Sequence, residues 1–215
     1  MERYLSDDDR ELISRFYDSR YKELGRSVKT VGWGNVADQR LRFEVLFRNL
    51  NPKGKRILDV GCGLGDLVDF LDGITRGDYE YLGIDLSDAL IQDACERWKS
   101  PKRRFVTGDL LSLPQPLACD IAVQSGALSL KIRDNDAHAR ALLTRMFELA
   151  EETVSANFLS TYVDFIAEKN YHFSPETMFQ FGKSLTPWVA MFHDYPLWEF
   201  TLQLHHSSKQ AQVAL

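Results

Sequence analysis

A glycine-rich turn in the first third of the chain could bind a nucleotide or a nucleoside. An apolar run over residues 57–60, typical of a buried strand, leads directly into it. Three glycines then alternate with other residues: Gly61, Gly63 and Gly65. Glycine adopts left-handed backbone conformations and lets a ligand approach the chain closely. A strand, such a turn and a following helix together form a nucleotide-sized crevice.

The spacing and charge of this turn indicate which kind of ligand it takes. The dinucleotide fingerprint has its last glycine at the position where this chain has Asp66. A carboxylate there, with Asp59 and Asp69 close in sequence, is a poor neighbour for a doubly charged pyrophosphate. The Walker pattern also fails, because no Gly-Lys-Ser/Thr follows the turn. We therefore expect a cationic nucleoside ligand without phosphate.

An acidic residue follows the next apolar run. Residues 79–84 lead into Asp85, about 20 residues beyond the turn, where the next strand of a βαβ unit ends. A carboxylate at this place can accept hydrogen bonds from both hydroxyl groups of a ribose. The alternative is an acid that only stabilises the start of a helix, since Ser87 looks like a helix cap.

Residues 58–65, Leu-Asp-Val-Gly-Cys-Gly-Leu-Gly, resemble the first motif of the class I S-adenosylmethionine-dependent methyltransferases. The segments 32–34, 157–160 and 193–196 are similar to recurrent segments of short bacterial members of this family. In the family's order, the runs 104–106 and 120–123 are followed by Gly108-Asp109-Leu110 and by Gln124. The resemblance implies that Asp109 accepts from the adenine amino group while its neighbour packs against the ring. It implies S-adenosyl-L-methionine as the cofactor, bound by these residues: Asp59, Gly61, Cys62, Gly63, Gly65, Asp85, Leu86, Asp109, Leu110 and Gln124.

Residues outside these motifs are candidates for the remaining contacts. Gly32-Trp33-Gly34 is either a loop that swings an aromatic ring over a ligand or an ordinary turn with a packed tryptophan. Arg42 could donate to the carboxylate of the cofactor's amino-acid part. The segments after the expected fifth and sixth strands should reach the same edge of the sheet. The candidate substrate residues are Trp33, Asn157, Tyr162 and Tyr195.

His193 is the candidate catalytic residue, a general base beside Asp194, because histidine titrates near neutral pH. Neighbours on a strand point to opposite faces, so His193 could instead be a structural residue of the turn. A sulfonium methyl group requires a base only if the acceptor is an alcohol, a phenol or an ammonium. No cluster has metal-ligand spacing, and surface positions are expected for the other histidines: His138, His172, His205 and His206.

The order of apolar runs predicts an α/β fold. Strands that alternate with helices indicate a doubly wound, mostly parallel sheet. Residues 188–192 and 199–204 predict an antiparallel C-terminal hairpin, as in the family's seven-stranded sheet. An apolar stripe from Ile13 to Leu24 predicts an N-terminal helix that lies across the carboxyl edge as a lid, or packs as an extra helix. We therefore divide the chain into two regions: residues 1–36, with the lid helix and the Gly-Trp-Gly loop, and residues 37–215, the methyltransferase domain.

Composition limits the classes of partner. The length of 215 residues and the 44% hydrophobic content fit one domain with an ample core. A net charge of −5 disfavours nucleic-acid substrates, and no apolar run reaches the roughly 18 residues needed to span a membrane. Three cysteines without a CxxC pair predict free thiols in a reducing, cytoplasmic setting.

The leading interpretation is a methyltransferase that transfers a methyl group from S-adenosylmethionine to an oxygen or nitrogen atom of a small molecule by in-line displacement. One alternative is a sensor or interaction module that binds S-adenosylmethionine without turnover. Another is the same fold acting on tRNA or protein, and a more distant one is a nicotinamide-dependent oxidoreductase. Aromatic residues near the expected site favour a small acceptor with an apolar or ring portion.

Overall fold

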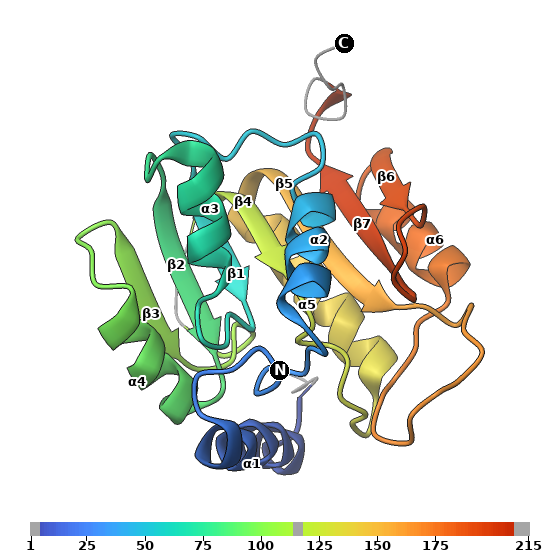
Figure 1. Ribbon diagram of the computed structural model, residues 1–215. Coiled ribbons are helices and arrows are strands. Elements are labelled where there is room, and N and C mark those ends of the chain that lie inside the picture. The colour runs from blue at the N-terminus through green and yellow to red at the C-terminus, as the bar shows by residue number, and fades with distance from the viewer. Residues whose placement is uncertain (1–4, 114–117, 209–215) are drawn as a thin grey trace.

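The computed structural model describes residues 5–113 and 118–208, and within them seven strands form one sheet (Figure 1). The strands are β1 (Arg56–Val60), β2 (Glu80–Asp85), β3 (Arg103–Thr107), β4 (Cys119–Gln124), β5 (Ala150–Leu159), β6 (Trp188–Phe192) and β7 (Glu199–His205). Their order across the sheet is β3-β2-β1-β4-β5-β7-β6. Neighbours from β3 to β5 pair in parallel, whereas β7 is antiparallel to both β5 and β6. The predicted doubly wound sheet with an antiparallel hairpin is confirmed.

Helices cover both faces of the sheet, with α2 and α3 in front of it and α5 behind it in Figure 1. The helices are α1 (Asp7–Leu24), α2 (Val36–Leu46), α3 (Leu67–Thr75), α4 (Asp88–Arg97), α5 (Asn135–Leu149) and α6 (Pro175–Leu185). Successive residues of a strand face opposite sides. Ile57 accordingly packs into the apolar cluster of α2 and α3, and Leu58 into that of α5 and α6. This double burial explains why the β1 sequence is continuously apolar apart from its acid.

Local sequence signals position the helices correctly. The Ser87 hydroxyl caps α4 by accepting from the backbone N–H of Leu90 at 3.2 Å. Ser174 caps α6 in the same way, and Pro175 occupies the first turn. Strand β5 begins at Ala150, and its first two acids, Glu151 and Glu152, form ion pairs with Arg56 and Lys55 at the start of β1.

Helix α1 lies below the carboxyl edge of the sheet (Figure 1). Its start is capped by Ser6, whose hydroxyl accepts from the Asp9 backbone N–H at 3.1 Å. Its other end is attached to α4, because Arg26 donates to the buried carboxylate of Asp93 at 2.7 Å. Of the helices in the described part of the chain, none combines the length and the apolar character that crossing a membrane requires.

Candidate functional site

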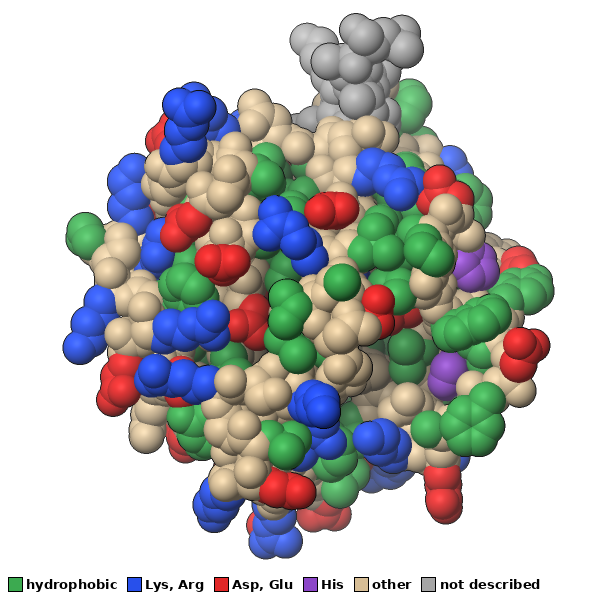
Figure 2. All heavy atoms as spheres, in the orientation of Figure 1, with side chains coloured by type: hydrophobic (Ala, Val, Ile, Leu, Met, Phe, Trp, Pro, Cys, Tyr) green, Lys and Arg blue, Asp and Glu red, His purple; other side chains and the backbone are tan. Residues whose placement is uncertain are grey.

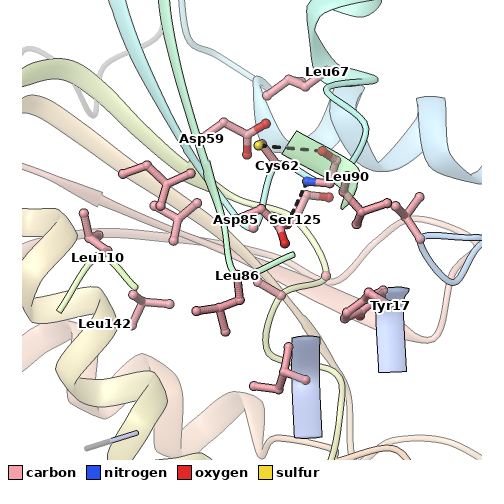
Figure 3. Close-up of a pocket in the computed structure, with 18 of the residues that line it drawn as sticks. Tyr17, Asp59, Cys62, Leu67, Asp85, Leu86, Leu90, Leu110, Ser125 and Leu142 are labelled. Atoms are coloured by element: carbon pink, nitrogen blue, oxygen red, sulfur yellow. Dashed lines mark hydrogen bonds between the residues drawn. The ribbon is translucent and has the colours of Figure 1, made fainter. Parts of the chain in front are cut away.

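A cavity opens at the carboxyl ends of β1, β2 and β4, between the sheet and α1 (Figure 3). Its empty volume is about 970 Å³, part of which is open to solvent. Its floor includes the glycine turn, Asp85 and the segment 125–127. Helix α1 and the following loop form the opposite wall through Ile13, Tyr17 and Trp33.

The backbone of the glycine turn approaches its neighbours too closely for side chains. Gly61 has φ +74°, and a Cβ atom there would lie 2.3 Å from the Cβ of Ala127. At Gly63, with φ +54°, an added Cβ would lie 2.8 Å from Val31. The N–H of Gly61 donates to the carbonyl oxygen of Ile84 at 2.8 Å, which attaches the turn to the end of β2. The alternating glycines are therefore required for this geometry.

Asp85 is held at the end of β2 by backbone donors. Its carboxylate accepts from the N–H of Gly63 at 2.8 Å and from the N–H of Ser87 at 3.0 Å, and the Gly63 bond is dashed in Figure 3. Burial raises the pKa of Asp85, while these backbone hydrogen bonds oppose the shift. The side chain lines the cavity, so an oriented, acceptor-only group faces the bound ligand.

Asp59 lies deeper in the cavity wall, and the hydroxyl of Tyr81 donates to its Oδ2 atom at 2.6 Å. Burial raises the pKa of Asp59 from 3.8 to about 7, because the charged form loses its hydration. Between those values the folded protein keeps a proton that the unfolded chain releases. Stability therefore falls as the pH rises through this window.

This shift makes a prediction about stability. We expect Asp59→Asn to remove most of the fall in stability between pH 5 and 8 and to raise the free energy of unfolding at pH 8 by roughly 2–4 kcal/mol. Urea denaturation of both proteins at the two pH values measures the effect. Equal unfolding free energies for the wild-type protein and Asp59→Asn at both pH values would contradict the raised pKa.

Asp109 follows β3 and is joined to α1. Arg10 donates to its Oδ2 atom from Nε at 3.2 Å and from Nη2 at 2.9 Å. The backbone N–H of Leu111 donates to the other carboxylate oxygen at 3.0 Å. Asp109 and Leu110 both line the cavity, as does Leu86. The two acids after β2 and β3 are thus brought to one cavity, as the sequence predicted.

Arg42 is buried and clamped between two partners. Its Nε donates to Glu199 at 2.6 Å, its Nη2 also contacts that carboxylate, and its guanidinium lies 3.7 Å from the centre of the Trp33 ring. Its Nη1 atom lies against Gly126, which lines the cavity, because a Cβ atom added to Gly126 would be 2.9 Å from Nη1. Trp33 is therefore a packed tryptophan stacked on a cation, the second of the two alternatives for this loop, and it also lines the cavity.

Several predicted residues lie away from the cavity wall. Gln124 donates from Nε2 to the carbonyl oxygen of Asn157 at 3.3 Å. Asn157 and Tyr195 both make hydrogen bonds to the Thr201 hydroxyl on β7, at 2.9 and 3.1 Å. These buried groups form a polar cluster between β4, β5 and β7 that the sequence pattern did not reveal.

His193 and Tyr162 lie farther along the sheet edge. Both side chains are exposed, their rings are 5.9 Å apart, and the Tyr162 hydroxyl contacts Glu176. They share the carboxyl edge with the cavity, as expected from parallel strands. The strand order places β6 at the outer end of the sheet, so His193, which follows β6, does not lie beside β4. Tyr162 follows β5, the neighbour of β4, but does not line the cavity. Their roles at the acceptor stay predictions.

Tyr17, Ser125 and His138 are among the cavity residues that were missed from the sequence. Tyr17 belongs to the expected lid helix, and Ser125 follows β4 with a buried hydroxyl that lacks a hydrogen-bond partner among the described residues. The expectation of a surface position is wrong for two histidines: His138 is only 7% exposed and lines the cavity, and His205 is 2% exposed because β7 is buried in the sheet. The place of His138 one residue before the apolar stripe of α5, at Ala139 and Leu142, could have indicated an inward-facing side chain.

Comparisons with known proteins identify the family. A family model described as a methyltransferase domain matches residues 57–169. The protein named "Putative methyltransferase Rv1506c" from Mycobacterium tuberculosis (strain ATCC 25618 / H37Rv) is 30% identical over 160 residues, 71% of this chain and 93% of the relative.

Solved structures share the fold at lower identity. Magnesium protoporphyrin IX methyltransferase from Synechocystis PCC 6803 has a TM-score of 0.65 at 15% identity, covering 92% of this chain and 98% of its own. The 1,6-didemethyltoxoflavin-N1-methyltransferase of Burkholderia thailandensis has a TM-score of 0.65 at 18% identity, covering 90% and 86%. With the family match and the cavity at the carboxyl edge, the chain belongs to the methyltransferase-domain family and is a class I S-adenosylmethionine-dependent methyltransferase, as residues 58–65 indicated.

Proposed function

We propose that the enzyme transfers a methyl group from S-adenosylmethionine to an oxygen or nitrogen atom of a small molecule. The observation that carries the cofactor assignment is the Asp85 carboxylate, oriented by the N–H groups of Gly63 and Ser87 beside a glycine turn. The cavity residues fit a cationic nucleoside, because Asp59 and Asp85 both face the ligand. A pyrophosphate would meet these acids without a basic residue from the turn.

Each part of the cofactor has a candidate partner in this cavity. Asp85 accepts from the ribose hydroxyls, and Asp109 accepts from the adenine amino group. Leu86 and Leu110 pack against the ring, and the turn around Cys62 lies under the amino-acid part. Arg42 donates to the amino-acid carboxylate from Nη1, with Glu199 and Trp33 fixing the direction of its guanidinium.

The bound cofactor supplies an electrophilic methyl group on a sulfonium, so the protein's task is to position the acceptor. Holding a nucleophile in line can supply roughly 7–11 kcal/mol of the barrier. Trp33 lines the cavity and is the acceptor-side residue best placed for a ring-containing molecule. Asn157, Tyr162 and Tyr195 stay proposals for the acceptor side, although none of them lines the cavity. His193 is the proposed base where the acceptor carries a proton.

A small acceptor is favoured by charge and by structural relatives. Basic and acidic side chains lie interspersed over the face shown in Figure 2, with no basic stripe of the kind that nucleic-acid enzymes present. Two neighbours in fold are named for small molecules, magnesium protoporphyrin IX and 1,6-didemethyltoxoflavin. The three cysteines lack disulfides within the described residues, which agrees with the proposed cytoplasmic setting.

Transfer of a labelled methyl group separates the functions that this cavity could serve. The enzyme is incubated with methyl-labelled S-adenosylmethionine and a cell extract divided into metabolites, RNA and protein. We expect the label in the metabolite fraction, and mass spectrometry then identifies the product. Label in RNA or protein would contradict the small-molecule acceptor. Tight binding without labelled product in any fraction would indicate the alternative, a sensor without turnover.

We also propose that residues 1–36 act as a lid on the domain formed by residues 37–215. Ile13 and Tyr17 of α1 line the cavity, and Arg10 reaches across to Asp109. The hydroxyl of Ser87, two residues from Asp85, donates to Asp18 at 2.5 Å. The helix is thus attached to both segments proposed to bind the adenosine.

The lid makes a kinetic prediction. We expect Arg10→Ala to speed dissociation of S-adenosylhomocysteine about tenfold, since a charged pair that is partly exposed is lost. Stopped-flow tryptophan fluorescence measures the rate. Arg15→Ala is the matched control, because Arg15 pairs with Glu11 on the solvent side of the same helix. Equal dissociation rates for the two variants would contradict the lid.

A further inference from the structure

His138 is a cavity residue whose hydrogen bonding is incomplete. It lies near the start of α5 and is 7% exposed, and it shares the cavity wall with Leu110 and Leu142. Its Nδ1 atom is buried without a hydrogen-bond partner among the described residues. A buried polar atom of this kind costs free energy unless a ligand or a ring rotation supplies a partner. Nothing in the glycine turn or in the methyl transfer uses this imidazole.

The charged groups around His138 determine its protonation state. Asp9 and Arg10 on α1 and Asp109 after β3 all act on it electrostatically. Burial outweighs the two carboxylates and lowers the pKa of His138, so the ring is neutral near pH 7. A neutral imidazole has one nitrogen that accepts a hydrogen bond. His138 therefore presents an acceptor in the wall of the cavity that Asp109, also an acceptor, lines as well.

Two acceptors in the wall of one cavity fit a ligand group with two N–H donors. Asp109 is the residue assigned to the exocyclic amino group of adenine. This amino group has two N–H donors, and a carboxylate oxygen of Asp109 accepts only one of them. Resting on the proposed function, we infer that His138 is a second binding residue for this amino group. Asp109 accepts one N–H, and the unprotonated nitrogen of the His138 imidazole accepts the other once the ring turns this nitrogen toward the cavity. This pair makes the cavity selective for a 6-amino purine over a 6-oxo purine.

Calorimetry with two ligands tests this assignment. S-adenosylhomocysteine carries the amino group, whereas S-inosylhomocysteine carries an oxo group at the same position. We expect wild-type protein to prefer the adenosyl compound strongly. His138→Leu should weaken adenosyl binding about tenfold, the cost of one hydrogen bond to a neutral acceptor, and leave inosyl binding unchanged. The preference of His138→Leu for the adenosyl over the inosyl compound is therefore about tenfold smaller than that of the wild-type protein. His138→Asn, which keeps an acceptor at the same distance from the backbone, should retain most of it.

His172→Leu provides a matched control. His172 is also partly buried with an unpartnered ring nitrogen, but it lies outside the cavity, on the segment between β5 and α6. This variant should keep the wild-type preference. If His138→Leu weakens both ligands equally, its role is structural and the inference is overturned. If wild-type protein binds neither ligand, the proposed function itself fails, which is a distinguishable result.

Discussion

Gly61→Ala should weaken S-adenosylhomocysteine binding more than any other single methyl addition, by at least about 100-fold. The new Cβ would lie 2.3 Å from the Cβ of Ala127, and neither atom belongs to a flexible side chain that could move away. The φ angle of +74° adds roughly 1–2 kcal/mol of backbone strain for a residue other than glycine. Relief requires the turn or the segment after β4 to shift, and both line the cavity. Calorimetry measures the loss.

Gly73→Ala is the control for this substitution. Gly73 lies in α3, and an added Cβ would meet nothing within 4 Å. Since alanine favours a helix, we expect unchanged binding and a gain of roughly 0.5–1 kcal/mol in stability. Thermal melts of both variants show whether Gly61→Ala remains folded. A folded Gly61→Ala protein with wild-type affinity would contradict the requirement for a bare backbone in this turn.

Asp85→Ala should weaken S-adenosylmethionine binding about 100-fold, equivalent to about 2.7 kcal/mol. Hydrogen bonds to a charged group are worth roughly 1.5–3 kcal/mol each, and two ribose hydroxyls are assigned to this carboxylate. The substitution also removes the acceptor for the Gly63 N–H, which loosens the turn. Asp85→Asn keeps one acceptor oxygen and should lose less.

Asp69→Ala removes the same charge close to the turn and is the control for Asp85→Ala. Asp69 is exposed in the first turn of α3 and does not line the cavity. We expect the affinity of the Asp69→Ala protein for S-adenosylmethionine to equal that of the wild-type protein. Equal weakening by the two substitutions would mean that general electrostatics, and not a ribose contact, accounts for the effect of Asp85.

Most of the cofactor side could be predicted from sequence because it depends on local patterns. The acids and glycines there lie in the last residues of a strand or just after it, and parallel strands bring such positions to one edge. Helix caps such as Ser87 are equally local. The class I fold, the enzyme class and the cofactor were predicted correctly for this reason.

The remaining features depend on contacts between distant parts of the chain. Arg42 meets Glu199 across 157 positions, and Arg10 meets Asp109 across 99. Neither pair has a sequence signature. The strand order, which places β7 between β5 and β6, puts β6 and the following His193 at the outer end of the sheet. His138 was misjudged because a lone histidine carries no signal of burial until the packing of α5 is known.

A crystal structure of the enzyme with S-adenosylhomocysteine tests the central claim most directly. The account predicts the adenosyl group in the cavity at the ends of β1, β2 and β4, with both ribose hydroxyls on Asp85 and the adenine amino group on Asp109. An adenosyl group bound elsewhere, or lying in the cavity with its ribose away from Asp85, would contradict it.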